Sequence, residues 1–254
     1  MSFQRSPGVC LRKIDFSETS QVLHFYTRDH GKVACIAKGS KRKKGAFLSP
    51  FDFLAVYDLI RIEKRPGTLD IVTQADLVRI FPELRADYAR YAAACYGAEF
   101  VDEFAVEGVV TPGLYEFLVE LLERLEGGTR VPDAVFSFEA RGLRALGYFP
   151  RVRQCGTCRG EIRRPDAYFS VEDGGALCVE CRPRNERWFP VRRASLESIA
   201  RLGEGEMPRE AMKRGLVQEI RQIFDLCVRY HLERELKSAR FLRDLIHSGA
   251  ESPS

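Results

Sequence analysis

Two pairs of cysteines constrain the fold of this chain more than any other feature. Cys155 and Cys158 form one C-x2-C unit, Cys178 and Cys181 form a second, and nineteen residues separate the pairs. Each unit can direct two thiolates at one metal ion, and two units complete the tetrahedral all-sulfur shell that suits Zn²⁺. No histidine lies between or beside the pairs, so the shell is closed to water and substrate. We therefore predict one structural zinc ion per chain.

The segment between the pairs is typical of a small hairpin held by the metal. Residues 167–171 form a strand-like run, and Asp173, Gly174 and Gly175 follow it as a turn signal. We expect this zinc module to span residues 151–193. Two alternatives stay open, namely four free thiols without a metal and a redox pair of the C-x2-C kind.

The remaining cysteines fit a reduced compartment. Cys10, Cys35, Cys95 and Cys227 stand singly within apolar patterns, which is typical of small buried hydrophobic residues. Residues 1–7 lack the apolar core of a secretory signal, and no apolar run reaches the ~18 residues of a membrane span. We expect a cytoplasmic protein without membrane contact, in which metal binding is favoured over disulfides.

Charge is distributed unevenly along the 254 residues. Residues 1–80 hold 14 Lys and Arg against 8 Asp and Glu, whereas residues 81–150 hold 6 against 12. The zinc module holds 10 Arg against 6 acids, and residues 194–254 balance at 10 each. A basic front end followed by an acidic middle predicts that a polyanion binds the N-terminal part.

The first 80 residues have the pattern of short strands rich in β-branched and aromatic residues. Five strands with tight turns predict a small closed barrel, and the five-stranded oligonucleotide-binding (OB) barrel is the leading candidate. Spacing alone does not distinguish it from an SH3-like barrel. The five runs are 9–14, 22–27, 32–38, 51–62 and 69–80.

Helical periodicity begins after Phe81 and Pro82. Apolar residues recur every three or four positions in residues 81–150 and again in residues 194–247. We expect these parts to form one α-helical bundle into which the zinc module is inserted, with residues 248–254 as a disordered tail. The predicted fold is therefore α+β, with an OB-like barrel over residues 1–80 followed by the interrupted helical domain.

A basic loop within the predicted barrel is the leading candidate for contact with nucleic acid. Five positive charges fall within residues 38–44, and clustered Lys and Arg neutralise phosphates and release counterions. The alternative is a solvated charged loop without a ligand. The candidate residues are Lys38, Lys41, Arg42, Lys43 and Lys44.

A second turn and an aromatic run extend this hypothesis. Arg61, Lys64 and Arg65 lie at another turn between strands, where they either enlarge the basic surface or keep a hairpin tip soluble. Four aromatic residues follow the basic loop. One or two of them could stack on bases if exposed, but their alternation along a strand favours the barrel core for most of them. They are Phe47, Phe51, Phe53 and Tyr57.

The sequence offers little support for an enzyme. The four histidines, at positions 24, 30, 231 and 247, lack the carboxylate spacing of a general base or a metal site. The zinc-deaminase pattern is absent, because Gln154 and Leu177 precede the cysteine units where that pattern requires proline. Glycine motifs for nucleotides or for a nucleophilic serine are also absent. We expect a binding protein without catalytic activity.

Short motifs along the chain resemble, in the right order, the bacterial RecO family of DNA repair proteins. They span nearly the whole chain, so the resemblance is specific although each motif alone is weak. One departure lies in the basic loop, where the family often has Pro-Lys-Ser and this chain continues from Lys44 to Gly45 and Ala46. The motifs are residues 11–20, 25–27, 31–32, 37–40, 50–51, 74–77, 81–84, 138–139, 146–148, 174–175, 236–238 and 241–242 and the four paired cysteines.

The resemblance implies an OB barrel, a helical domain and a zinc element in a recombination mediator of the bacterial nucleoid. It implies binding to single- and double-stranded DNA, annealing of complementary strands and cooperation with a RecR-type partner. With that partner, family members load recombinase onto strands coated by single-strand binding protein. Some also dock that protein's acidic C-terminal tail on the helical domain. Here Arg141 and Arg144 are the best candidates for that contact, and the alternative is ordinary helix surface.

Two other function classes stay open from the residues alone. A zinc-ribbon adaptor for protein assembly needs no contact with DNA, but it also does not need a strongly basic barrel. A redox enzyme would require the paired cysteines to react without a metal. The arginines of the zinc module either add DNA contacts or keep its hairpin soluble. They are Arg151, Arg153, Arg159, Arg163 and Arg164.

Overall fold

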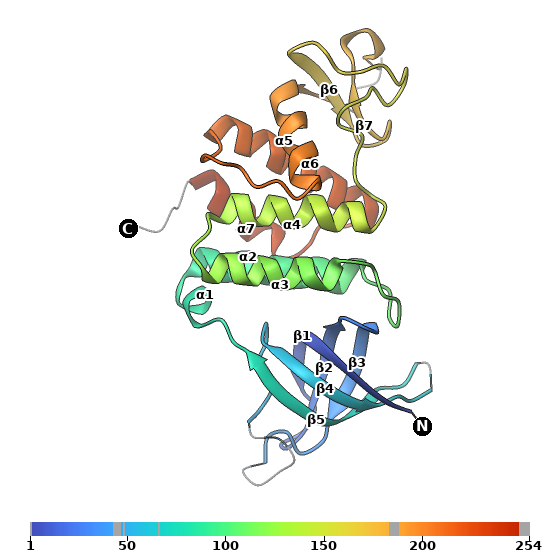
Figure 1. The fold of residues 1–254 in the computed structure, drawn as a ribbon, viewed down its shortest axis with the longest axis vertical. Helices are drawn as coiled ribbons and strands as arrows, with labels where there is room; N and C mark the ends of the chain where they lie inside the picture. Colours follow the sequence, from blue (N-terminus) through green and yellow to red (C-terminus); the bar gives the residue numbers. More distant parts are fainter. Residues whose placement is uncertain (1, 43–46, 48, 66, 183–187, 249–254) are drawn as a thin grey trace. The chain divides into compact units, whose positions relative to one another are not determined.

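The computed structural model describes residues 2–42, 47, 49–65, 67–182 and 188–248. Contacts within the chain divide it into two compact units, Met1–Gly128 and Thr129–Ser254. Among the described residues, the first unit holds a five-stranded sheet and three α-helices, and the second holds a three-stranded sheet and four α-helices (Figure 1). The mixed α+β class expected from the sequence is confirmed.

The sheet of the first unit is built from β1 (Phe3–Asp15), β2 (Gln21–Thr27), β3 (Gly31–Ala37), β4 (Val56–Ile62) and β5 (Asp70–Arg79). The strands close into a barrel in the order β1-β2-β3-β5-β4, and β1 also pairs with β4. β3 and β5 run parallel, whereas the other neighbours run antiparallel. β1 pairs with β4 over residues 3–9 and with β2 over residues 8–15, and its register with β2 shifts between Cys10 and Arg12.

Alternating side chains fill the interior of this barrel. Leu23 and Phe25 on β2 face the core together with Val33 and Cys35 on β3, while the residues between them are partly exposed. Aromatic rings close the space, with the centroids of Phe25 and Phe51 5.9 Å apart in an edge-on arrangement. The alternation of apolar and polar residues that predicted these strands therefore corresponds to their buried and exposed faces.

The fourth strand is shorter than the run of residues 51–62 that the sequence predicted. Leu54 has a positive φ of 65°, which interrupts an extended strand. Its backbone N–H donates to the Cys10 carbonyl at 2.9 Å, and the Cys10 N–H donates to Ala55 at 3.0 Å. Residues 51–55 therefore form a turn that packs on β1, and β4 begins at Val56.

Three helices complete the first unit, namely α1 (Pro82–Ala86), α2 (Tyr88–Phe104) and α3 (Leu114–Glu126). Asp87 caps α2 by accepting from the Arg90 N–H. α2 and α3 pack closely at Gly97, where an added Cβ would lie 2.3 Å from a Leu121 methyl group. Polar contacts join this helical pair to the barrel, since Lys32 of β3 lies 3.4 Å from the Asp102 carboxylate of α2.

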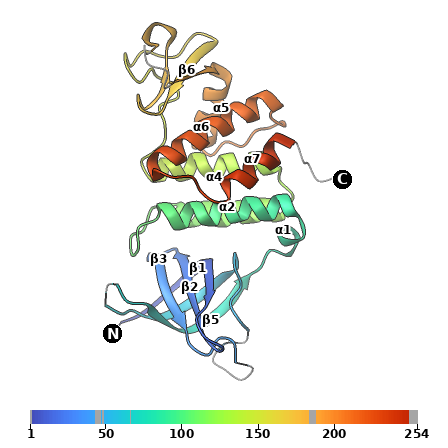
Figure 2. The ribbon, with the colours of Figure 1, turned by 180° about the vertical axis from the view of Figure 1, so that it is seen from behind.

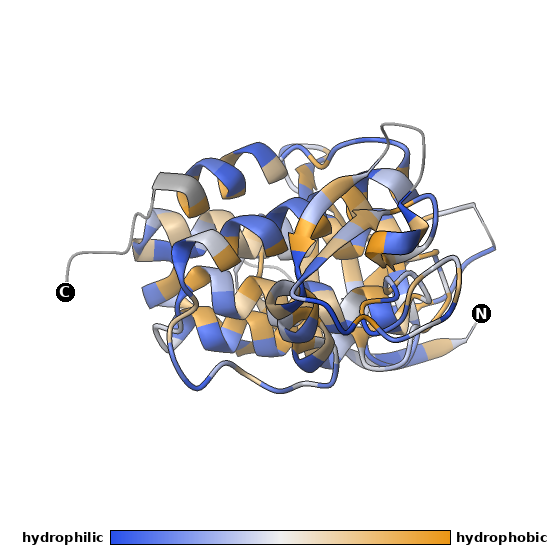
Figure 3. Cartoon of the chain, turned by 90° about the horizontal axis from the view of Figure 1, so that it is seen from above, coloured by the Kyte–Doolittle hydropathy of each residue, from blue (hydrophilic) through white to orange (hydrophobic). Residues whose placement is uncertain are grey.

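The second unit contains α4 (Val131–Ala145), β6 (Asp166–Ser170), β7 (Gly175–Leu177), a 3-10 turn η1 (Val179–Cys181), β8 (Phe189–Arg192), α5 (Arg193–Gly203), α6 (Arg214–Leu232) and α7 (Ala239–Ser248). The short sheet has the order β7-β6-β8. α4 packs against α5 and α6 (Figure 2). A bidentate ion pair between Glu139 of α4 and Arg221 of α6 is buried between these two helices. The helices are amphipathic, with hydrophilic and hydrophobic residues along each (Figure 3).

This grouping of helices differs from the one expected from the sequence, in which residues 81–150 and 194–247 formed one bundle. The boundary between the compact units falls after Gly128, so α1, α2 and α3 group with the barrel and α4 groups with the later helices. Asp102 and Thr111 make polar contacts with the barrel residues Lys32 and Tyr26. The spacing of apolar residues does not reveal such contacts, so the sequence did not predict that these helices group with the barrel.

Two further expectations concern the ends and the membrane. The expected tail falls almost entirely outside the described residues, apart from Ser248 at the end of α7. In the part of the chain that the structure describes, none of the helices has the length and apolar character needed to cross a membrane.

Candidate metal centre and nucleic-acid interface

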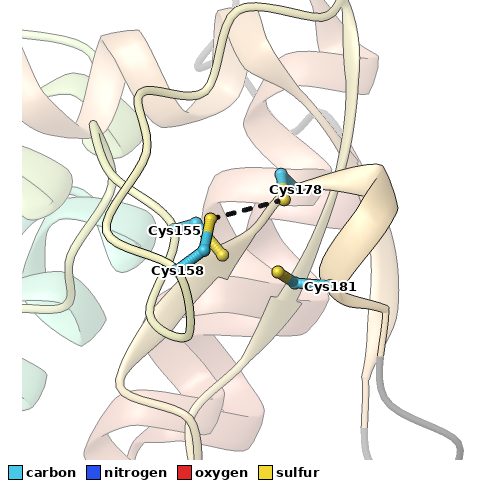
Figure 4. Close-up of side chains that lie close together, drawn as sticks. All are labelled: Cys155, Cys158, Cys178 and Cys181. Carbon is cyan, nitrogen blue, oxygen red and sulfur yellow. Dashed lines mark hydrogen bonds between the residues drawn. The ribbon is translucent and has the colours of Figure 1, made fainter.

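The four predicted cysteines meet in one cluster within the second unit (Figure 4). All four Sγ atoms lie within 4.8 Å of one another, and those of Cys158 and Cys178 are 3.8 Å apart. Sulfur atoms about 2.3 Å from a tetrahedral zinc ion are about 3.8 Å from each other, so the cluster has the size that such an ion requires. The arrangement is compatible with zinc, and the expected convergence of the two pairs is confirmed.

Backbone hydrogen bonds shape the first cysteine turn. The Cys155 N–H donates to the Gly160 carbonyl at 2.8 Å, and the Arg159 N–H donates back to Cys155 at 3.0 Å. Arg159 adopts a positive φ of 65° to close this turn. Gly156 is required next to it, because an added Cβ would lie 2.2 Å from the Asp173 carbonyl oxygen. The first turn is thereby fixed against the β6–β7 hairpin.

The second cysteine turn follows directly from that hairpin. Cys178 comes after the last residue of β7, and the Cys181 N–H donates to the Cys178 carbonyl at 3.1 Å across η1. The Gly156 N–H of the first turn donates to Ala176 of β7 at 2.8 Å. Each C-x2-C unit is thus held by its own backbone and by the strand between them, which brings four sulfur atoms to one point.

The thiols of the cluster differ in acidity. Burial raises the pKa of Cys155, but hydrogen bonds from the backbone N–H groups of Cys158, Cys178 and Thr157 outweigh this effect and lower the pKa to about 6. Burial and the hydrogen bond with Cys181 raise the pKa of Cys178 to about 12. Cys155 is therefore a thiolate at neutral pH, and a metal ion would displace the proton of Cys178.

The other cysteines lie apart from this cluster. Cys10, Cys35 and Cys227 are buried, as expected, and Cys95 is half-buried. Burial raises the pKa of Cys10 and of Cys227 to about 12, so these thiols stay protonated at neutral pH. They act as small apolar residues of the core.

The basic loop begins directly after β3 in the first unit. Lys38 and Arg42 are exposed, whereas Lys41 is partly buried and its Nζ atom lies 2.7 Å from the Asp15 carboxylate. This lysine lowers the pKa of Asp15 by donating a hydrogen bond to it. Lys43 and Lys44 lie outside the described residues. Two exposed cations and one paired lysine are therefore positioned here.

The second basic turn contributes less than the sequence indicated. Arg61 is only 6% exposed, and its guanidinium forms an ion pair with Asp70, nine residues later. The Lys64 N–H donates to the same carboxylate at 2.8 Å, while Arg65 is exposed. Placing Arg61 on the DNA-contacting surface was wrong, because its side chain is buried and holds the β4–β5 connection. Lys64 and Arg65 stay candidates for that surface.

Most of the aromatic run lies in the core, as its alternation indicated. Phe47, Phe51 and Tyr57 are buried within the barrel, and Phe53 is partly exposed. Sequence reasoning missed a different aromatic residue, Phe16, which is 67% exposed at the turn between β1 and β2. Its position directly before the polar residues 17–20 could have identified it as a ring on a turn.

The remaining candidate arginines belong to the second unit. On α4, Arg144 is exposed and its guanidinium lies 4.2 Å above the ring of Phe149, while Arg141 is partly buried. In the zinc module, Arg163 and Arg164 pair with Glu161 and Glu180. These ion pairs lower the positive potential at Arg163 and Arg164, which makes the two side chains less available to a polyanion.

Comparison with known proteins covers both units. The family model for the recombination protein O N terminal matches residues 1–81, and the model for its C terminal matches residues 85–240. DNA repair protein RecO of Anaeromyxobacter sp. strain K is 33% identical over 248 residues, which covers 94% of this chain and 95% of that protein. The RecO proteins of Desulforudis audaxviator and Bacillus subtilis are 34% and 28% identical, over 96% and 92% of this chain and 98% and 92% of their own lengths. The similarity therefore extends over almost the full length of each.

Proposed function

The chain belongs to the RecO family of DNA repair proteins, and from this premise we propose that it is a recombination mediator that binds single- and double-stranded DNA and anneals complementary strands. The observation that carries the proposal is the family match over both units, at up to 34% identity with RecO proteins along nearly their whole length. The mediator acts without a catalytic step of its own, in the cytoplasm at the nucleoid.

We assign DNA binding to the barrel. The strand order β1-β2-β3-β5-β4 with a parallel β3–β5 pair fits an OB fold, whose strands and loops bind oligonucleotides. The exposed cations Lys38 and Arg42 follow β3 on this barrel, and Lys41 joins them when its contact with Asp15 opens. Phosphate contacts of this kind carry no sequence preference, so binding is independent of sequence.

The zinc module has a structural role in this proposal. Cys155, Cys158, Cys178 and Cys181 would hold one Zn²⁺, which cross-links the two cysteine turns and has no open position for a substrate. The metal therefore stabilises the hairpin of β6 and β7. DNA binding by the first unit does not depend on it.

Two protein partners complete the proposal and rest on family membership. A RecR-type partner works with the chain to load recombinase onto strands coated by single-strand binding protein. The acidic tail of the latter docks on the second unit, where Arg144 is exposed beside Arg141 on α4. A cation on a helix surface suits an acidic peptide, and the ring of Phe149 beneath Arg144 supplies an apolar contact.

A salt titration with single-stranded DNA tests the proposed DNA site. Replacing Lys38, Lys41 and Arg42 together by alanine removes three positive charges, of which the exposed Lys38 and Arg42 contact phosphates while Lys41 is paired with Asp15. Binding should weaken, and the slope of log K against log salt should fall in magnitude by about 1.4 on single strands. A matched variant with Arg209, Lys213 and Arg240 changed to alanine removes the same charge from exposed positions of the second unit and should bind as the unchanged protein does.

The outcome separates the two function classes. Equal losses in both variants would mean that net charge alone attracts DNA, and the basic loop would lose its assigned role. No measurable binding by the unchanged protein would favour an adaptor that assembles proteins without contacting DNA.

A further inference from the structure

A row of apolar side chains crosses the outer face of the barrel. Ile14 of β1 pairs with Val22 of β2, which pairs with Ile36 of β3, and Ile36 pairs with Ile71 of β5. Directly paired residues lie on the same face of a sheet, and neighbours such as Leu23 point into the core, so this row faces outward. Ile14 is 43% exposed and the other three are partly exposed.

Phe16 continues this apolar surface beyond the end of β1. Its N–H donates to the Ser20 carbonyl at 3.0 Å, and the Ser20 N–H donates to the Ser17 hydroxyl at 3.1 Å, so the turn of residues 16–20 is ordered by its own hydrogen bonds. Burial of the Phe16 side chain contributes little to the stability of the fold, because about two thirds of its surface remains in contact with water. Next to an exposed apolar row, such a ring offers a flat contact surface to a ligand.

The turn that carries Phe16 is bonded to the start of the basic loop. The Lys41 N–H donates to Thr19 at 3.1 Å, and the Gly39 N–H donates to the Ser20 hydroxyl at 3.3 Å. Buried Gln21 reinforces the junction, because its carboxamide oxygen accepts from the Ser40 hydroxyl and from the Phe51 N–H, each at 3.1 Å. The ring of Phe16 and the cations that follow β3 thus stand on one hydrogen-bonded frame.

Charge indicates which ligand would cover this surface. Lys38, Arg42 and Arg12 are exposed in the segments that flank the apolar row. The carboxylates nearby are Asp15, which is paired with Lys41, and Glu18 on the turn itself. An apolar face bordered by cations complements a ligand that has flat apolar groups on an anionic backbone. A single strand of nucleic acid has this composition, whereas in a duplex the faces of the bases are stacked on each other.

We propose that Phe16 and the row of Ile14, Val22 and Ile36 form a platform for unpaired bases, with the phosphates of the same strand held by Lys38 and Arg42. This inference rests on the proposed DNA-binding function and adds to it the residues that contact the bases of an unpaired strand. Stacking on Phe16 tolerates every base, because each base has a π face. The platform therefore distinguishes unpaired from duplex strands, but it does not distinguish one base sequence from another.

Two probes of equal length and charge test the platform. One is an oligothymidylate and the other is the matching abasic strand, which keeps the phosphates and lacks the bases. The unchanged protein should bind the oligothymidylate about tenfold more tightly at the same salt concentration, the size expected for stacking of one base. Phe16→Ala should remove most of this preference while leaving the salt slope unchanged, and Phe16→Trp should retain the preference.

An exposed tyrosine elsewhere in the same unit provides the matched control. Tyr88 on α2 is 66% exposed, so Tyr88→Ala removes a ring of similar exposure and should keep the preference for bases. Because the Phe16 side chain lies mostly in water, Phe16→Ala should unfold at the same temperature as the unchanged protein, which confirms that the fold is intact.

The contradicting results are distinct from a failure of the proposed function. Equal binding of both probes by the unchanged protein would overturn the platform while leaving a DNA site that recognises phosphates. A Phe16→Ala variant that weakens both probes equally would make the ring a support of the basic loop, and one that weakens neither would assign the apolar row to a protein partner. Failure to bind either probe would instead reject DNA binding itself.

Discussion

At the scale of single residues, Asp15 limits the charge that the basic loop can offer to DNA. Its carboxylate holds Lys41 at 2.7 Å, and this hydrogen bond lowers the pKa of Asp15, so the pair is intact at neutral pH. Asp15→Asn should release Lys41 for phosphate contact. We expect severalfold tighter binding of single-stranded DNA and a salt slope steeper by about 0.7, the value for one added contact.

The control for this variant is a second neutralised acid on the same turn. Glu18→Gln removes the same charge without releasing Lys41, because Lys41 is paired with Asp15 and Glu18 is exposed on the turn. Glu18→Gln should change the affinity for single-stranded DNA only slightly and should leave the slope of log K against log salt unchanged. Equal effects of the two substitutions would show that Lys41 does not reach a phosphate.

The buried pair of Glu139 and Arg221 predicts the largest effect of one substitution in the second unit. Both side chains are excluded from water, with Arg221 Nη2 2.7 Å from Glu139 Oε1. Arg221→Met leaves a buried carboxylate without its main cation, so unfolding of this unit should become easier by about 3–5 kcal/mol. Trp188 is the one tryptophan of the chain and lies in this unit, so its fluorescence in a urea titration reports the change.

Two companion variants make this result specific. Arg221→Met together with Glu139→Leu removes both charges and should restore most of the loss. Arg240→Met changes an exposed arginine of α7 and should stay within about 0.5 kcal/mol of the unchanged protein. If Arg221→Met is as stable as Arg240→Met, the ion pair does not hold α4 to α6.

Some single residues could be placed from the sequence and others could not. The four clustered cysteines follow from their spacing, because a C-x2-C turn brings its own two sulfur atoms together. Arg61 is buried because it pairs with Asp70 in the next strand, and the order of residues along the chain does not identify that partner. Phe16 was missed for the opposite reason, since an aromatic residue beside strands is normally counted with the core.

At the scale of elements, the four-cysteine module predicts a metal-dependent hairpin. The protein prepared under reducing conditions without chelator should contain about one zinc ion per chain by elemental analysis. Cys155→Ser should lose the ion and loosen the β6–β7 hairpin, because three ligands leave the shell incomplete. Cys95→Ser, which changes a half-buried thiol outside the cluster, should keep it. Absence of metal from the unchanged protein would exclude the proposed site.

Metal affinity should also depend on pH with a defined sign. Zinc needs thiolates, and the raised pKa values of Cys178 and Cys181 mean that binding at pH 7 releases protons, so affinity rises with pH. Below about pH 6 the Cys155 thiolate, whose pKa is lowered to about 6, also takes up a proton. The fall in affinity should therefore steepen there when a zinc indicator competes with the protein. A pH-independent affinity would contradict the all-thiolate shell.

The bounds of several elements depend on contacts that periodicity does not contain. The strand alternation of β2 and β3 was readable, because one face of each is buried and the other is not. β1 extends well beyond residues 9–14, because it pairs with β4 over residues 3–9 and with β2 over residues 8–15. β4 starts late because Leu54 takes a left-handed conformation to pack a turn on β1.

At the scale of the whole molecule, the order of barrel, helices and zinc module could be predicted, but the grouping of the helices could not. An apolar stripe shows that a helix has a buried face without showing what covers it. α2 meets the barrel partly through polar atoms, as in the contact of Lys32 with Asp102, and such contacts add nothing to the apolar period. The division after Gly128 was therefore not readable from the pattern of residues.

The central claim is that this chain mediates recombination by pairing strands rather than by catalysing a reaction. A basic surface speeds pairing because it screens phosphate repulsion within the Debye length, which is ~10 Å at about 0.1 M salt. The most direct measurement is a fluorescence annealing assay with complementary strands, bare or coated by single-strand binding protein, with and without ATP. We predict acceleration of both kinds of strand, no effect of ATP, and loss of the effect when Lys38, Lys41 and Arg42 are changed to alanine. Annealing that requires ATP, or no acceleration of coated strands, would contradict the account.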